Sequence, residues 1–393
     1  MPVTGIVECL QALKPDLVRM SDFIFDHPEA GLEEVQAAGL LSGFLRERGF
    51  QVEPGYGGLA TAFRATWRNG EGGPRIGLLC EYDAIKGLGH ACAHHLQGPG
   101  IIGAALAARA AVGEAPCVLE VIGTPAEEIG EGGKNLMLRQ GAFQDLDVTL
   151  MMHGGDSTQT DVKSLALTEL HVAFKGVAAH SAIAPEKGRS ALEALLLAFN
   201  GIAFLRGHVK DDTRIHGVID SAGQAVNVIP ERAEARIEMR SYDRAYLDQV
   251  IGRVLRILEG AALMTDTGWE VLDRMDTHNK IPVLSLNRLL MKNAERAGAG
   301  RIMPPRERTG STDYASVMYH VPGSCIRVPF VEPGTPSHSQ VYLDRGKTEA
   351  AHDAMLMGAT ILALTVLDLV RDKDQLQAIQ EDFRAAKARS LSA

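Results

Sequence analysis

Thiol, imidazole and carboxylate side chains gather in short stretches of the chain, each close to the end of a run of apolar residues. Together these stretches supply Cys92, His94, Glu127, Glu128, His153 and His338. Sulfur, imidazole nitrogen and carboxylate oxygen are the ligands that zinc-like ions prefer. Cys92 and His94 are two positions apart, so in extended backbone both side chains point the same way. Of the two adjacent acids, one can ligate a metal while the other handles protons. The combination predicts a metal site.

Each of these residues also has an ordinary structural interpretation. A lone cysteine is usually buried and inert, and an adjacent glutamate pair suits the start of a helix. A different chemical interpretation is a metal-free thiol hydrolase that uses Cys92 with His94 or His95. However, side chains two positions apart rarely aim at each other, and this mechanism leaves the other candidate ligands without a role.

The apolar runs are typical of buried β-strands. They are Arg75–Asp83, Cys117–Thr124, Asp147–His153 and Ser324–Phe330. Helical patterns occupy Gly100–Val112, Gly133–Phe143, Leu284–Ala297 and Thr348–Val370. Uninterrupted apolar strands separated by helices predict an α/β domain whose mostly parallel sheet is covered by helices on both faces. Ligands of such sheets bind beyond the carboxyl ends of the strands, where the candidate residues are found.

The middle of the chain has a different pattern. Arg232–Arg240 alternates apolar and charged residues, and Tyr246–Gly260 carries apolar residues at helical spacing. The predicted order of elements is β-α-β-β-α-β, the ferredoxin-like split unit with one solvated sheet face. We therefore expect a catalytic domain at 1–165 and 279–393, with an inserted α+β domain at 166–278. The tail after Arg371 is charged, and we expect it to be peripheral.

Composition narrows the functional classes. The chain has 393 residues and a net charge of -9, which argues against a broad nucleic-acid surface. Its 5 cysteines are an odd number without a Cys-x-x-Cys pair, so a disulfide framework is not expected. The first 20 residues do not have the pattern of a secretory signal, so we expect none, and the most apolar stretches are interrupted by polar residues. We expect a cytoplasmic protein that binds neither nucleic acid nor membrane.

Longer motifs connect these residues to a known family. They are EYDAIKGLGHACAHH (81–95), GTPAEE (123–128), MMHG (151–154), GVAAHSAIAPEKGRSALEAL (176–195), AVNVIPERAEARIEMRS (225–241) and GSTDYASV (310–317). They run in family order over nearly the whole chain. The sequence resembles the M20 family of metallopeptidases and amidohydrolases, in particular its aminoacylase-like M20D branch. That branch includes the subunits of aminobenzoyl-glutamate hydrolases and the dipeptidase-like amidohydrolases.

The resemblance implies a zinc-peptidase-like fold with a lid domain and assigns roles to residues. The implied ligands of two divalent metal ions are Cys92, His94, Glu128, His153 and His338. Glu127 would be the general base, and Asp83 would orient a ligand histidine, with a role as a cap at the end of a strand as the alternative. His180, in the lid, would reach the active site of a partner subunit and stabilise the oxyanion, which implies a homodimer through the lid. Asn227 would contact the substrate, with a role as a turn residue before Pro230 as the alternative.

The implied reaction is hydrolysis of the amide bond in an N-acyl or aminoacyl amino acid or a dipeptide. Zinc is the expected ion, with manganese, cobalt or nickel as alternatives. A third interpretation, a non-catalytic partner subunit of an amidohydrolase complex, conflicts with the presence of Glu127. The family's Cys-Gly-His is Cys92-Ala93-His94 here, and Ala93 would be strained if its φ were positive. His95 stands where relatives often have Asn or Asp, which leaves open whether His94 or His95 is the ligand.

Overall fold

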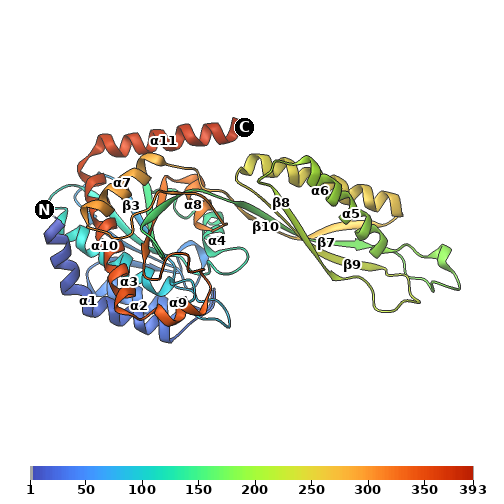
Figure 1. Cartoon of the computed structure of the whole chain (residues 1–393), viewed down its shortest axis with the longest axis horizontal. Helices are drawn as coiled ribbons and strands as arrows, with labels where there is room; N and C mark the ends of the chain where they lie inside the picture. Colours follow the sequence, from blue (N-terminus) through green and yellow to red (C-terminus); the bar gives the residue numbers. More distant parts are fainter. Residues whose placement is uncertain (1–2, 393) are drawn as a thin grey trace. The chain divides into compact units, whose positions relative to one another are not determined.

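The computed structural model describes residues 3–392 and divides into two compact units (Figure 1). The larger unit holds the chain up to Ser164 and again Lys280–Ala388, and the smaller unit holds Leu165–Asn279 and the residues from Arg389 onward. Each unit has its own hydrophobic core, so each is described by itself.

The larger unit is built on a mixed sheet in the order β1-β2-β4-β3-β5-β12-β6-β11. The strands are β1 (Gln51–Pro54), β2 (Phe63–Asn69), β3 (Arg75–Cys80), β4 (Cys117–Gly123), β5 (Val148–Gly155), β6 (Gln159–Ser164), β11 (Arg306–Thr309) and β12 (Gly323–Pro329). The neighbours β4, β3, β5 and β12 are mutually parallel. The apolar runs of the sequence form these strands because both faces of each strand are buried.

Helices cover both faces of this sheet. They are α1 (Val3–Asp26), α2 (Val35–Glu47), α3 (Gln97–Ala111), α4 (Gly133–Arg139), α7 (Leu284–Arg296), α8 (Tyr314–His320), α9 (Gln340–Arg345), α10 (Glu349–Arg371) and α11 (Lys373–Ser392). Leu78 and Leu150 pack in the core that includes α1, α3 and α10, whereas Leu79 and Met151 pack in a separate core with α4 and α8. Successive strand residues thus serve opposite faces, and the expected α/β fold with a mostly parallel sheet is confirmed.

Two helices at the end of the chain differ from simple expectations. Among the described helices, α10 alone is long and apolar enough to cross a membrane, but 83% of its apolar window is buried inside the protein, as in a core helix. The tail after Arg371 is not merely peripheral, because α11 buries Ile379 and Phe383 in the large core. That expectation from its charged composition was wrong.

The smaller unit has an antiparallel sheet in the order β10-β7-β9-β8. Its elements are β7 (Ala166–Lys175), α5 (Ala191–Leu205), β8 (Arg214–Ser221), β9 (Arg232–Ser241), α6 (Arg244–Thr265) and β10 (Gly268–Thr277). The chain order is β-α-β-β-α-β, and α5 and α6 cover one face of the sheet (Figure 1). The alternation in Arg232–Ser241 buries Ala233, Ala235, Ile237 and Met239 against these helices, as its pattern predicts.

Candidate metal centre

The four central parallel strands place the sequence-predicted ligands at one edge of the sheet. Cys92 and His94 follow β3, Glu128 follows β4, His153 lies in β5, and His338 follows β12. The structure brings them together. Ligand atoms of Cys92, His94 and His153 lie within 4.8 Å of one another, and the same limit holds for Cys92, Glu128 and His338. Cys92 belongs to both sets.

Distances within the cluster suit a shared coordination site. Cys92 Sγ lies 3.6 Å from Nε2 of His153. Oε1 of Glu128 lies 3.4 Å from Nε2 of His338 and 4.0 Å from Nε2 of His94. Burial and the nearby Arg327 lower the pKa of His153 to about 3, which keeps its imidazole neutral, the form that binds metals.

The geometry separates His94 from His95. Nδ1 of His94 lies 3.1 Å from Oδ1 of Asp83, which fixes the ring so that Nε2 faces the cluster. The other oxygen of Asp83 accepts a hydrogen bond from the backbone N–H of Glu128 at 2.8 Å. Nε2 of His95 instead lies 2.8 Å from the carbonyl oxygen of Gly346, outside the cluster. His94 is therefore the histidine positioned to ligate, and Asp83 is placed to orient it.

The polar atoms of the cluster test whether a cation fits. Nε2 of His94 and Oε1 of Glu128 are buried and make no hydrogen bond within the described chain. Buried polar atoms without hydrogen bonds are rare in folded proteins, and the neighbours of these two atoms are sulfur, nitrogen and oxygen atoms, including Oε2 of Glu81 at 3.3 Å from Nε2 of His94. A divalent cation satisfies such a set. The residues present fit a metal centre.

The backbone at the cluster is strained. Ala93, Ala126 and His338 have φ of 64°, 64° and 60°, in the left-handed region that residues with a side chain rarely adopt. Ala93 separates the ligands Cys92 and His94, and Ala126 precedes the acidic pair. Because Ala93 replaces the family's glycine at a positive φ, the strain anticipated from the sequence is present. Strain of this kind concentrates at functional sites.

Glu127 faces a second group of charged residues that the sequence did not single out. Its carboxylate lies within 4.8 Å of those of Glu81 and Asp313. Between these acids lies Lys134, fully buried, whose Nζ donates to Glu81 at 2.6 Å and to Asp313 at 2.7 Å. Burial and the carboxylates of Glu81 and Asp313 raise the pKa of Glu127 well above its usual range. A carboxylate with a raised pKa is a stronger base than an ordinary glutamate, which suits general acid–base work.

One signal for this charged group was present in the sequence. Glu81 directly follows the buried strand β3, at the same edge as the predicted ligands. Lys134 and Asp313 gave no such signal, because they start short helices whose pattern does not reveal a buried charge.

The thiol-hydrolase interpretation does not fit this environment. Burial raises the pKa of Cys92 to about 12 in the metal-free protein. A reactive cysteine needs the opposite shift, because the thiolate is the nucleophile. Cys92 therefore fits a metal ligand, whose thiol releases its proton when a cation binds the sulfur, and not a free nucleophile.

His180 and Asn227 lie in the smaller unit, in two adjoining exposed loops. The backbone N–H of Ser181 donates to the carbonyl oxygen of Asn227 at 3.0 Å, and His180 forms an isolated bridge with Val228. The structure thus brings these two predicted residues together on one surface of that unit.

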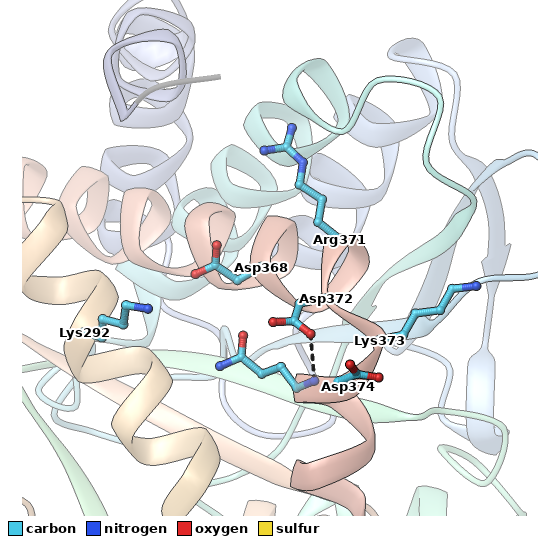
Figure 2. Close-up of a pocket in the computed structure, with 7 residues that line it drawn as sticks. Lys292, Asp368, Arg371, Asp372, Lys373 and Asp374 are labelled. Carbon is cyan, nitrogen blue, oxygen red and sulfur yellow. Dashed lines mark hydrogen bonds between the residues drawn. The ribbon is translucent and has the colours of Figure 1, made fainter.

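A surface hollow elsewhere in the larger unit has no part in this chemistry. It lies where α10 meets α11, beside α7, and is lined by Lys292, Asp368, Arg371, Asp372, Lys373, Asp374 and Gln375 (Figure 2). Charges of both signs alternate along it, and Asp372 accepts a hydrogen bond from the backbone N–H of Gln375. None of the candidate metal ligands lines it.

Fold and site together define a class of protein, a hydrolase with an α/β metal-binding unit and a separate α+β unit. Residues 164–265 match the family model described as the peptidase dimerisation domain. The chain is 32% identical to the Xaa-Arg dipeptidase of Homo sapiens, over 96% of this chain and 91% of that protein. It is 29% identical to a subunit of the p-aminobenzoyl-glutamate hydrolase of Escherichia coli, over 96% and 94%. The chain belongs to the M20 family, as its motifs predicted.

Solved structures show the same fold. An aminobenzoyl-glutamate utilization protein from Klebsiella pneumoniae superposes with a TM-score of 0.72 at 22% identity, over 92% of this chain and 97% of that one. A dinuclear metal binding M20 peptidase from Bacillus subtilis superposes with a TM-score of 0.70 at 18% identity, over 92% and 99%. The curated relatives are hydrolases of amide bonds, and this chain is an enzyme of that class.

Proposed function

We propose that this enzyme hydrolyses the amide bond between an acyl or aminoacyl group and an amino acid whose carboxylate is free, using two divalent metal ions. The observation that carries the proposal is the pair of ligand sets that share Cys92 and lie beside Glu127. The ligands would be Cys92, His94, Glu128, His153 and His338. Two overlapping sets joined by one thiolate suit a pair of ions better than a single ion.

The residues divide the catalytic work. When bound, the ions supply a water of lowered pKa and polarise the scissile carbonyl. Glu127 takes the proton from the attacking water and returns it to the leaving amine, because its raised pKa lets it hold a proton between the two steps. Asp83 holds His94 in the orientation that ligation needs.

Zinc is the ion we propose, because a thiolate and imidazoles are the softer ligands of this set. Manganese, cobalt and nickel remain alternatives, since such sites bind several ions and availability decides which is present. The relatives named as a dipeptidase, an aminobenzoyl-glutamate hydrolase and an N-acetylcysteine deacetylase support small amide substrates.

We also propose a homodimer formed through the smaller unit. Its strand β8 is an edge strand with one side unpaired and exposes Val218 and Ile219. On α5 the side chain of Phe204 is 75% exposed. An unpaired edge with exposed apolar residues is a typical association surface, and the dimerisation-domain match supports it. His180 would then act on the partner's substrate.

A cytoplasmic location remains part of the proposal. All five cysteines are free thiols, which suits a reducing compartment.

The test combines metal replacement with one substitution. Apo-protein is prepared with a chelator, reloaded with each ion, and assayed on a panel of N-acyl amino acids and dipeptides. Activity should disappear with the metal and return with zinc. In the loaded enzyme, Glu127→Gln should lower kcat by about 10²–10⁴-fold while metal content stays unchanged.

The matched control is Glu71→Gln, which changes an exposed glutamate in a loop of the same unit and should leave kcat unaltered. Full activity in metal-free protein would favour the thiol mechanism. Unchanged turnover in Glu127→Gln would refute the proton-transfer role.

A further inference from the structure

Arg327 lies beside the metal centre, although no motif of the sequence assigns it a role. Strands β12 and β5 are parallel neighbours, and their register places Arg327 opposite His153. One guanidinium nitrogen of Arg327 lies 3.3 Å from Nδ1 of His153, whose Nε2 lies 3.6 Å from Cys92 Sγ. A single imidazole ring therefore separates this guanidinium from the ligand cluster.

The contact with His153 gives Arg327 no hydrogen-bond acceptor. Nδ1 of His153 lies 2.7 Å from the carbonyl oxygen of Gly154. A neutral imidazole whose Nε2 faces a metal site carries its proton on Nδ1 and donates it, here to Gly154. The guanidinium and this N–H are then both donors, and two donors do not bond each other.

The contact of Arg327 with Asp161 is an ion pair too long for a hydrogen bond from Nε. The Nε of Arg327 is buried without a hydrogen-bond partner, and Oδ2 of Asp161 lies 3.5 Å away. Within residues 3–392, these are the polar contacts that the structure gives this side chain. Burying a charged donor without an acceptor is unfavourable, so the site favours an anion that supplies one.

The charged groups around Arg327 also favour an anionic ligand. Both oxygens of Asp161 already accept from Arg306, at 2.6 and 2.9 Å. Nζ of Lys280 donates to the backbone oxygen of Asp161 at 2.6 Å. Asp161 is thus shared among Arg306, Lys280 and Arg327, so it does not neutralise Arg327 by itself. The side chain of Arg327 is 24% exposed, so a ligand can reach it.

We propose that Arg327 binds the free carboxylate of the amino-acid part of the substrate and so determines specificity. This inference rests on the proposed function and names the group that selects its substrates. A planar guanidinium with unsatisfied donors matches a carboxylate through paired hydrogen bonds. Because the carboxylate is bound equally before and during the reaction, the contact affects KM more than kcat. Substrates that end in a carboxamide lack the carboxylate and so lose the contact with Arg327.

The experiment compares N-acetyl-L-methionine with its carboxamide, in which a neutral amide group replaces the charged carboxylate. In metal-loaded enzyme, Arg327→Met should raise KM for the acid about tenfold to hundredfold, the size of a hydrogen bond to a charged group. It should change hydrolysis of the carboxamide less than threefold and leave metal content unchanged. Arg327→Lys should raise KM less than Arg327→Met does, because lysine keeps the positive charge but lacks the paired N–H donors of the guanidinium.

Arg296→Met is the matched control, because Arg296 is an ion-paired arginine of the same unit, bound to Asp368. It should leave both substrates unaffected. Equal losses on acid and carboxamide in Arg327→Met, or loss of metal, would overturn the proposal and assign Arg327 a structural role.

A binding measurement separates this inference from the proposed function. Calorimetric titration of N-acetyl-L-methionine into metal-loaded Glu127→Gln, with and without Arg327→Met, reports the contact without turnover. Weaker binding of N-acetyl-L-methionine to the protein that also carries Arg327→Met supports the carboxylate site. Equal binding to both proteins refutes it. If wild-type enzyme hydrolyses no member of the panel, the proposed function fails, and this titration still decides the role of Arg327.

Discussion

Replacing Lys134 with methionine should destabilise the larger unit more than any substitution of a surface lysine. Lys134 is fully buried, and its Nζ bonds Glu81 and Asp313 at 2.6 and 2.7 Å. Methionine has a similar length but no charge, so it leaves two buried carboxylates without a cation. Removing one partner of a buried ion pair costs about 3–5 kcal/mol, which lowers the melting temperature by roughly 10 °C.

The stability lost in Lys134→Met should depend on pH. In the wild type, burial would raise the pKa of Glu81, but Lys134 and His94 oppose this and lower it to about 2. The ionised form is therefore stabilised at every pH above the ordinary value of 4.5. Without Lys134, burial raises the pKa, so the folded variant binds protons that its unfolded chain releases. The stability gap between variant and wild type should widen as pH rises.

Thermal melts of chelator-treated protein at pH 5.5 and pH 8 would measure both effects. The control is Lys347→Met, because Lys347 pairs with Asp26 on the surface, where the two side chains are 38% and 52% exposed. An exposed pair contributes at most about 1 kcal/mol. If the two variants melted alike at pH 8, or if the Lys134 variant lost more stability at pH 5.5, the buried-charge reasoning would be wrong.

Two further predictions follow from other residues. Burial raises the pKa of Glu34 to about 7 from 4.5, so stability should fall by about 3 kcal/mol as pH rises between these values. Glu34→Gln should flatten this dependence of stability on pH, as measured by chemical denaturation. An unchanged pH dependence would show that Glu34 is not its cause. His180→Ala should lower turnover without changing metal content. If His180 serves the partner's site, mixing this variant with Glu127→Gln through refolding should recover about a quarter of wild-type activity. No recovery would argue against that role.

The sequence predicted the central strands, and which polar side chains meet beyond them, for one physical reason. Fully buried parallel strands are continuous apolar runs, and polar residues beside their carboxyl ends stand out against them. Cys92 and His338 are far apart in the chain, yet β3 and β12 are separated in the sheet by β5 alone. Strand order, not sequence distance, decides which residues meet.

Sequence patterns did not predict several other features of the structure. Lys134 follows two glycines and pairs with Asp313, 179 positions away, so no local period reveals that it is buried. The strands β6 and β11 were not predicted, because they are short and carry charged residues on exposed positions. The buried side of α11 was missed because charged and amide side chains stand between its few large apolar residues.

The backbone strain at Ala93, Ala126 and His338 bears on how the ligand set is prepared. Each positive φ costs about 1–2 kcal/mol for a residue with a side chain, and each lies within two positions of a candidate ligand. The surrounding contacts hold these conformations: Oε1 of Glu34 accepts from the N–H of Ala126 at 2.8 Å, and the N–H of His338 donates to Ala91 at 3.0 Å. The fold itself therefore holds the ligand-bearing backbone in place, and metal binding need not supply the energy to order it.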